Sequence, residues 1–523
     1  MNATALLTDK EHHRLEIQAM LDSAKTQAER NRMGQFATPS LLASEILSYA
    51  KKLIPHGEKV RFFDPAFGTG AFYSALLQIF SLNRIAGATG YEIDPHYCDP
   101  TLHLWAEMPL DLRLSDFTKA PAPKDRFNLL ICNPPYVRHH HIINGEKTRI
   151  RAASYKACGL QFGGLAGLYC HFLGLSHAWM EDGGVAGWLI PSEFMDVNYG
   201  ATLKRYLLDK VRLLHIHRFD PYDVQFGDAL VSSAVVWFRK ERPPQDYDVE
   251  FSFGGTLSDP KQSRMISANT LRAAPKWTRF PQQDIHHAES VPTLSDFFEI
   301  RRGLATGDNK YFILTAQQIA ERGLPPDFFK PILPSPRYLP VAEISSDDRG
   351  NPLVQNPLFL LDCRLPEADV ERQYPTLWRY FQEGRERGVA TRYLCQHRSP
   401  WYAQENRPPA PFLCTYLGRG NVKTGRPFRF ILNQSRATVT NVYLALYPKR
   451  TVTRAIKQDP SCARRVWEIL SRISPASMLA EGRVYGGGLH KLEPKELANV
   501  PALDLADFLP EPSRGSRNGE LFS

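Results

Sequence analysis

Between residues 59 and 240, short apolar runs alternate with stretches whose apolar residues recur at helical spacing. The apolar runs are Val60–Phe63, Ala86–Tyr91, Leu129–Cys132, Val185–Ile190, Leu213–His217 and Ser232–Phe238. Each run is short enough to be one strand, and Leu76, Leu77 and Phe80 illustrate the helical spacing between two of them. Strands that alternate with helices form βαβ units around a mostly parallel sheet. The pattern therefore predicts a Rossmann-like α/β domain.

The pattern changes on either side of this region. Residues 1–33 are polar with a helical rhythm of apolar positions, which predicts a leading helix. Thr38-Pro39-Ser40 precedes another periodic stretch and is typical of a helix start. After the polar, proline-containing segment Glu241–Asp246 the alternation is lost, and basic and aromatic residues interleave. We therefore expect a first domain over residues 1–240 and an irregular α+β domain over residues 241–523.

Composition and charge narrow the class of protein. Hydrophobic residues make up 43% of the 523 residues and charged residues 23%, a globular mixture that excludes general disorder. The formal net charge is +9, and most of the excess lies beyond residue 240. This excess is what a part that binds a polyanion would show. Charge alone, however, is weak support for nucleic-acid binding.

The sequence also bears on the compartment. No apolar run approaches the ~20 residues that a membrane-spanning helix needs, and polar residues at 9–13 interrupt any signal-peptide core. The 8 cysteines include no Cys-x-x-Cys pair, so neither a structural zinc site nor a disulfide framework is indicated. We expect a cytoplasmic protein with no membrane partner and no metal site.

Three of the predicted strands end in residues suited to a small ligand. The first runs into Asp64-Pro65-Ala66-Phe67-Gly68-Thr69-Gly70, an acid and a glycine-rich turn before a helix, where the backbone approaches a ligand closely. Tyr73 stands where a dinucleotide fingerprint would have its third glycine, which disfavours a nicotinamide cofactor. The second strand ends in Glu92, placed to accept from ribose hydroxyls. At a third strand end, Ser115-Asp116-Phe117 offers an acceptor and an aromatic face for a purine.

The sharpest motif is Asn133-Pro134-Pro135-Tyr136, which follows the apolar strand Leu129–Cys132. Two prolines make this corner rigid and remove two N–H donors. The Asn133 side-chain oxygen and the Pro134 carbonyl are then both available to one –NH₂ group. Tyr136 offers a flat face on which a base can stack.

These motifs, in this order, resemble those of a known enzyme family. The resemblance rests on residues 31–39, 64–72, 90–95, 115–117 and 130–136. Together they resemble the S-adenosylmethionine-dependent DNA methyltransferases that act on amino groups. Because the Thr-Pro motif comes first and a large C-terminal region comes last, the order is similar to the gamma-class (TaqI-like) adenine-N6 methyltransferases of type II restriction–modification systems.

The resemblance implies a role for each motif. It assigns S-adenosylmethionine binding to Thr38, Asp64, Pro65, Ala66, Gly68, Gly70, Glu92, Ile93, Asp116, Phe117 and Asn133. Within that set, Thr38 and the Asp64–Gly70 turn would hold the methionine part, Glu92 the ribose, and Asp116 with Phe117 the adenine. It assigns catalysis and the target base to Asn133, Pro134, Pro135 and Tyr136. A second aromatic is expected to sandwich that base, and Phe226 is the best match, with Tyr222 as a rival.

The implied reaction is methylation of N6 of an adenine flipped out of double-stranded DNA, with residues 241–523 as the target-recognition domain. Cytosine-C5 methylation is disfavoured because no cysteine follows a proline. Cytosine-N4 methylation remains an alternative because its geometry is nearly the same, although relatives that act on cytosine tend to have Ser where Asn133 stands. Structured RNA and protein glutamine also remain alternatives, since Asn-Pro-Pro-Tyr occurs in enzymes that methylate them too.

The resemblance further implies the modification partner of a restriction system. The cognate endonuclease would share the target sequence without necessarily binding this chain, which we expect to be a monomer. The polar segment after the corner, residues 142–164, is expected to be a loop that orders when DNA binds. The recognised DNA sequence is not encoded in any short motif.

Overall fold

The structure is a computed structural model that describes residues 3–221, 223, 232–281, 291–419, 426–485 and 488–508. The chain divides into two compact units, Met1–His286 with Tyr485–Gly488, and His287–Val484 with Leu489–Ser523. Each unit is described by itself. Among the helices so described, none has both the length and the apolar character that crossing a bilayer requires.

The first unit is built on a nine-stranded sheet with the strand order β3-β2-β1-β4-β5-β7-β6-β8-β9. Its strands are β1 (Val60–Asp64), β2 (Ile85–Glu92), β3 (Asp111–Leu114), β4 (Phe127–Cys132), β5 (Met180–Pro191), β6 (Arg212–Arg218), β7 (Ser233–Arg239), β8 (Asp248–Gly255) and β9 (Pro260–Ser267). Strands β3, β2, β1, β4 and β5 pair in parallel, and β7 is antiparallel to both of its neighbours. The predicted Rossmann-like, mostly parallel α/β fold is confirmed.

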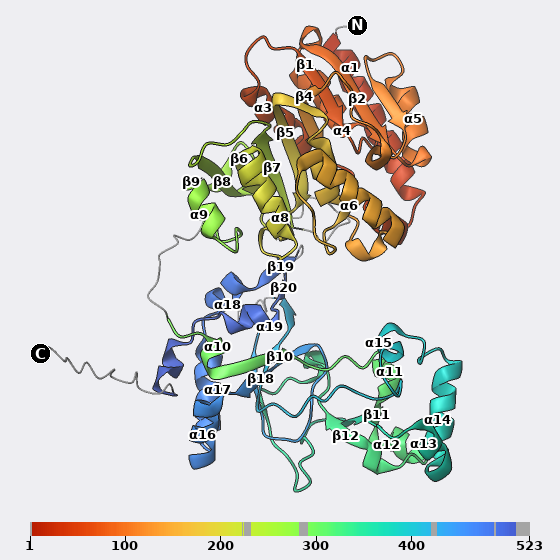
Figure 1. The fold of residues 1–523 in the computed structure, drawn as a ribbon, viewed down its shortest axis with the longest axis vertical. Helices are drawn as coiled ribbons and strands as arrows, with labels where there is room; N and C mark the ends of the chain where they lie inside the picture. The colour runs from red at the N-terminus through yellow and green to blue at the C-terminus, as the bar shows by residue number, and fades with distance from the viewer. Residues whose placement is uncertain are drawn as a thin grey trace, which may run out of the picture. The chain divides into compact units, whose positions relative to one another are not determined.

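Helices cover both faces of this sheet (Figure 1). They are α1 (Ala3–Ser23), α2 (Gln27–Met33), α3 (Ser40–Leu53), α4 (Ala71–Ile79), α5 (Pro95–Trp105), α6 (Asn144–Cys158), α7 (Leu168–Ser176), α8 (Gly200–Arg205) and α9 (Ala268–Ala273). Successive residues of a strand point to opposite faces, so β4 supplies Leu129 and Ile131 to one core cluster and Leu130 to the other. A central strand buried on both faces explains the unbroken apolar run in the sequence.

The boundary expected at residue 240 is wrong. Strand β8 pairs in parallel with β6 and β9 pairs antiparallel with β8, so both extend the first sheet. The segment Glu241–Asp246 is a connection within the first unit, which continues through β9 and α9. Its polar, proline-containing composition suits any exposed turn, and the sequence therefore does not distinguish a loop from a domain edge.

The leading segment is two helices rather than one. Helix α1 ends at Ser23, and Thr26 begins α2 with a capping box in which Thr26 and Glu29 exchange side-chain and backbone hydrogen bonds. Helix α2 ends at Gly34, which adopts the left-handed conformation with φ 68°. Helix α1 packs against α4 and α5.

The segment after the Asn-Pro-Pro-Tyr corner is also more ordered than expected. Residues 144–158 form α6, which packs against α7. His139–His141 form a short 3₁₀ turn before it. The expectation of a loop over residues 142–164 that orders only on DNA binding is therefore wrong for most of its length. Helix α6 buries only Ile150, Ser154 and Cys158, and this narrow apolar stripe hid it in the sequence.

The second unit contains three small sheets, with strand orders β10-β18-β15-β17-β13, β11-β14-β12 and β16-β20-β19. Their strands are β10 (Phe298–Arg302), β11 (Ile313–Thr315), β12 (Phe329–Ile332), β13 (Glu343–Ile344), β14 (Leu358–Leu361), β15 (Phe412–Thr415), β16 (Leu417–Arg419), β17 (Phe430–Asn433), β18 (Tyr443–Pro448), β19 (Arg483–Tyr485) and β20 (Leu489–Lys491). Most of these strands are short, and the predicted irregular α+β character is confirmed.

Short helices surround these sheets. They are α10 (Leu294–Phe297), α11 (Asn309–Phe312), α12 (Ala316–Glu321), α13 (Glu367–Gln373), α14 (Pro375–Glu386), α15 (Tyr393–Gln396), α16 (Arg450–Gln458), α17 (Cys462–Arg472), α18 (Pro475–Glu481) and α19 (Pro494–Ala498). Separate hydrophobic clusters underlie β10 with α17 and β11 with α14. The unit is thus assembled from small packed layers rather than one continuous core.

Candidate functional site

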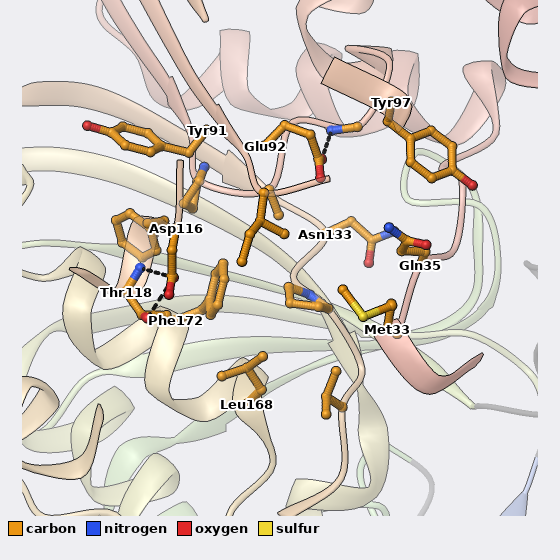
Figure 2. Close-up of a pocket in the computed structure, with 18 of the residues that line it drawn as sticks. Met33, Gln35, Tyr91, Glu92, Tyr97, Asp116, Thr118, Asn133, Leu168 and Phe172 are labelled. Carbon is orange, nitrogen blue, oxygen red and sulfur yellow. Dashed lines mark hydrogen bonds between the residues drawn. The ribbon is translucent and has the colours of Figure 1, made fainter. Parts of the chain in front are cut away.

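A cavity of about 450 Å³ opens where the parallel strands of the first unit end. The turn after β1 contributes Pro65, Ala66 and Gly68, and the ends of β2, β3 and β4 contribute Glu92, Asp116 and Asn133. Figure 2 shows Glu92, Asp116 and Asn133 around this cavity. The carboxyl ends of parallel strands share one edge of the sheet, and the order β3-β2-β1-β4 places the four motifs side by side there.

The other walls come from helices. Met33 is the last residue of α2 and Gln35 follows that helix, while Leu168 and Phe172 lie on α7. Gln18 and Asp22 of α1 also line the cavity, as do His141, Ile142, Ile143, Glu146 and Ile150 around the start of α6. The sequence predicted the strand-end residues but none of these helical walls.

The turn after β1 is tied to the end of β2. The Gly68 N–H donates to Glu92 Oε2 at 2.9 Å, and the Asp94 N–H donates to Glu92 Oε1 at 2.9 Å. Burial raises the pKa of Glu92, although the two backbone bonds oppose the shift. Each carboxylate oxygen keeps a further lone pair, so Glu92 is able to accept from a ligand hydroxyl while holding the turn.

Asp64 lies beneath the turn rather than on the cavity wall. Its Oδ1 accepts from the Ala66 N–H at 3.1 Å, and its buried Oδ2 has no hydrogen-bond partner among the described residues. Burial raises the pKa of Asp64 to about 8, with a further contribution from the negative charge of Glu92. The carboxyl is 1% exposed and is held next to the thiol of Cys132.

Gly70 has a packing role. It adopts φ 85° at the N-terminus of α4, and a Cβ there would lie 2.7 Å from the Phe67 ring and 2.9 Å from Trp105 Nε1. Neither Gly70 nor Thr38 lines the cavity as the structure describes it. These two positions, with Asp64, are the predicted cofactor residues that the geometry places behind the wall.

The end of β3 is fixed from α6. Asp116 Oδ1 accepts from the Thr118 N–H at 2.9 Å and from Thr118 Oγ1 at 2.7 Å (Figure 2). Arg149 donates to the Thr118 carbonyl at 2.8 Å and to Thr118 Oγ1 at 2.7 Å. The Phe117 ring packs against Phe172 with centroids 5.2 Å apart. An aromatic and apolar slot therefore adjoins the Asp116 carboxylate.

The Asn133 amide has a fixed orientation at the end of β4. Its Nδ2 donates to the Phe36 carbonyl at 3.0 Å and to Thr38 Oγ1 at 3.1 Å. Its Oδ1 is buried and has no hydrogen-bond partner among the described residues. A buried acceptor without a partner is costly, and it marks a place where a ligand donor fits.

Tyr136 completes the corner. Its hydroxyl donates to the Leu189 carbonyl at 3.0 Å, and its ring lies 5.5 Å from that of Phe36 at 42°. Pro135 lines the cavity, and Pro134 is buried behind it. The predicted second aromatic, Phe226, and its rival Tyr222 lie outside the residues that the structure describes.

The charged side chains that line the cavity indicate the chemistry of its ligand. Among the described lining residues, the carboxylates of Asp22, Glu92, Asp116 and Glu146 outnumber the cation Arg32. Hydroxyls, an aromatic ring and a positive charge all fit such a lining. Within the described part of the chain, no cluster of His, Cys, Asp and Glu side chains is arranged to hold a metal ion.

Two family models match the chain. The Eco57I restriction-modification methylase model matches residues 103–225, and the model of the C-terminal domain of the type II methyltransferase M.Eco57I matches residues 279–514. The first match includes the Asp116 and Asn133 motifs, and the second spans most of the second unit.

Whole-chain relatives agree with these models. The type II methyltransferase M.XamI of Xanthomonas campestris pv. amaranthicola is 26% identical over 90% of this chain and 86% of its own length. M.AccI of Acinetobacter calcoaceticus, another type II methyltransferase, is 25% identical over 91% and 86%. The fold is shared with the type IIL restriction-modification enzyme MmeI, solved with DNA, at a TM-score of 0.53 and 13% identity over 94% of this chain and 67% of that one. The chain is thus similar over most of its length to type II methyltransferases of restriction–modification systems, and this similarity implies S-adenosylmethionine as the cofactor.

Proposed function

We propose that this enzyme methylates N6 of an adenine in a specific sequence of double-stranded DNA, as the modification component of a restriction–modification system. The observation that carries the proposal is the Asn133 amide, whose two N–H groups are occupied while Oδ1 has no partner in the part of the chain that the structure describes. An exocyclic amine supplies the donor that this oxygen lacks. The corner lies at the rim of a cavity that suits S-adenosylmethionine.

The cofactor binds, in this proposal, along the strand ends. Glu92 accepts from the ribose hydroxyls, and Asp116 accepts from the adenine amino group, while Phe117 and Phe172 enclose the ring. The Asp64 carboxyl group supports the methionine end from beneath the turn. Bound S-adenosylmethionine would supply a methyl group on a positively charged sulfur: the amine nitrogen would form a bond to the methyl carbon, the carbon–sulfur bond would break with its electrons left on sulfur, and the methylated amine would lose one proton to solvent.

The protein's part in the reaction is to position and polarise the amine. The lone pair of the adenine amino nitrogen is delocalised into the ring, so this nitrogen is a poor nucleophile. Hydrogen bonds from its two N–H groups to Asn133 Oδ1 and the Pro134 carbonyl pull the hydrogens out of the ring plane. The lone pair is then localised and aimed at the methyl carbon. No covalent intermediate with the protein is needed.

The base reaches this corner by leaving the helix stack. Unstacking costs a few kcal/mol, and stacking on an aromatic ring returns roughly 1–3 kcal/mol for each base. Tyr136 supplies one face, and its hydrogen bond to the Leu189 carbonyl fixes the ring against β5. We propose Phe226 for the other face.

DNA as the substrate has independent support. The relatives are type II methyltransferases, one matching family model is that of a restriction-modification methylase, and MmeI, which shares the fold, was solved with DNA. The net charge of +9 favours a polyanionic partner. The second unit, matched over most of its length by the M.Eco57I C-terminal model, is the proposed target-recognition domain.

A product assay tests the proposal. Purified protein is incubated with labelled S-adenosylmethionine and DNA, and the DNA is then digested to nucleosides for mass spectrometry. We expect N6-methyladenine at one sequence, which long-read sequencing of the same DNA will identify. Cytosine N4 presents the same two N–H donors, so N4-methylcytosine as the product would overturn the choice of base. Label in RNA or protein, with unmodified DNA, would overturn the proposed function.

A further inference from the structure

The segment Gly34–Thr38 lies directly against the Asn133–Tyr136 corner. The Gly34 carbonyl accepts from the Tyr136 N–H at 3.2 Å. Gly34 has φ 68°, and a Cβ there would overlap the backbone nitrogen of Tyr136. Position 34 therefore requires glycine both for its conformation and for the close approach of the two backbones.

The same segment holds the catalytic amide. Asn133 Nδ2 donates to the Phe36 carbonyl at 3.0 Å and to Thr38 Oγ1 at 3.1 Å, so both of its hydrogens are used. A flipped amide would turn Oδ1 toward the Phe36 carbonyl, which is an acceptor only. Two acceptors would then face each other and the hydrogen bond to Phe36 would be lost, while the Thr38 hydroxyl would have to turn and donate to Oδ1. The Phe36 carbonyl therefore selects the orientation of the amide, and Thr38 Oγ1 holds the second hydrogen of the amide in that orientation.

Thr38 is placed for this role rather than for contact with the cofactor. It is 9% exposed, and its side chain does not line the described cavity. Pro39 follows it with φ −59° as the N-cap of α3, which fixes the direction of the chain at Thr38. The hydroxyl is thereby held just before the N-terminus of α3 and directed at Asn133.

We propose that Thr38 is a positioning residue that, with the Phe36 carbonyl, locks the Asn133 amide with its oxygen toward the substrate amine. This inference rests on the proposed function of Asn133. It gives Thr38 a role in the rate of methyl transfer and removes it from cofactor binding. Because both hydrogens of the Asn133 amide are held by Phe36 and Thr38, the amide presents only its acceptor oxygen to the substrate.

Substitutions at Thr38 test the lock. Thr38→Val keeps the shape and removes the hydroxyl, while Thr38→Ser keeps the hydroxyl. We expect Thr38→Val to lower kcat about tenfold, with Kd for S-adenosylmethionine and Kd for DNA within about twofold of the parent. Thr38→Ser should restore kcat to within about threefold. Thr278→Val, which removes a hydroxyl bound to Asp196 in the same unit, is the matched control and should leave kcat unchanged.

The outcomes distinguish a positioning role of Thr38 from a role in cofactor binding and from no role in the reaction. An unchanged kcat in Thr38→Val overturns the inference. A raised Kd for S-adenosylmethionine, with kcat recovered at saturating cofactor, assigns Thr38 to the cofactor and also overturns it. If Thr38→Val does not fold, judged by thermal unfolding, Thr38→Ala carries the same expectations. Normal turnover by Asn133→Ala would instead overturn the proposed function itself, independently of Thr38.

Discussion

The Gly68 N–H donates to Glu92 Oε2 at 2.9 Å, so the turn after β1 and the end of β2 are joined by one carboxylate. Glu92 Oε1 holds the Asp94 N–H in the same way. A glutamine at this position keeps one acceptor oxygen but turns an NH₂ group toward the other backbone donor. We expect Glu92→Gln to raise Kd for S-adenosylmethionine at least about tenfold, measured by titration calorimetry. The exposed Glu107→Gln is the control and should bind normally.

Asp64 makes stability depend on pH. Burial raises its pKa to about 8, well above the unfolded value, so the native state retains a proton that the unfolded state has lost between about pH 4 and 8. The free energy of unfolding therefore falls as pH rises across this window. Asp64→Asn removes the titration, and its Tm advantage over the parent should grow from pH 5 to pH 8. A constant Tm difference would contradict the raised pKa.

Asp94 provides a contrast of opposite sign. Although burial acts to raise its pKa, hydrogen bonds from Lys25 and Gln35 lower it overall. Its contribution to stability is present above the unfolded pKa and is lost as pH falls through the folded pKa. Asp94→Asn should therefore lower Tm at neutral pH, where Asp64→Asn raises it.

Asn133→Ala removes the acceptor on which the proposed reaction depends. We expect methyl transfer to fall by about 10²–10³-fold or more, by analogy with the loss of one preorganised hydrogen bond at a reacting atom. Binding of S-adenosylmethionine should change little, because the other strand ends remain. Single-turnover transfer of labelled methyl to DNA and calorimetric cofactor binding measure the two effects. Equal losses in both would mean that Asn133 serves the cofactor rather than the amine.

Arg149 holds the Asp116 turn from α6 through two hydrogen bonds to Thr118. Its removal should loosen the slot for the cofactor's ring, and we expect Arg149→Ala to raise Kd for S-adenosylmethionine about tenfold. Arg151 lies on the same helix and donates to the Phe162 carbonyl instead, which makes Arg151→Ala a matched control. A similar Kd for S-adenosylmethionine in both variants would show that the hydrogen bonds from Arg149 to Thr118 do not contribute to cofactor binding.

A basic protein that contacts many phosphates loses affinity steeply with salt. We expect Kd for a duplex containing the target to rise by about 10³-fold or more between 50 and 200 mM salt. The slope of log Kd against log salt counts the phosphates neutralised. Tm recorded over the same range controls for unfolding, and a flat response would contradict a DNA-binding surface of high positive charge.

The sequence predicted those site residues that directly follow a strand. Glu92, Asp116 and Asn133 each follow an apolar run, and the strand order brings them around one cavity. Phe172 could not be found in this way, because an apolar residue on a buried helix has the same pattern whether it faces a core or a ligand. Gln18 and Asp22 did carry a signal, since polar residues four apart share one face of a helix.

The direction of a side chain was the other missing information. Thr38 stands in a recognisable motif, but only the structure directs its hydroxyl at Asn133. Likewise Gly70 belongs to a glycine-rich turn, and only the neighbouring Phe67 and Trp105 show that packing demands it. The predicted extent of the first unit was wrong for a similar reason, because only the pairing of β8 with β6 and of β9 with β8 shows that these strands extend the first sheet.

The wall that α1 and α2 contribute to the cavity offers a handle for selective ligands. Side chains at the strand ends must match a ring, a sugar and a charge, which leaves them little freedom to differ between enzymes that use the same donor. Gln18, Asp22 and Met33 need only close the opposite side. A compound built on the donor's scaffold and extended toward these helices would contact side chains outside the strand-end motifs, and its potency would depend on those contacts.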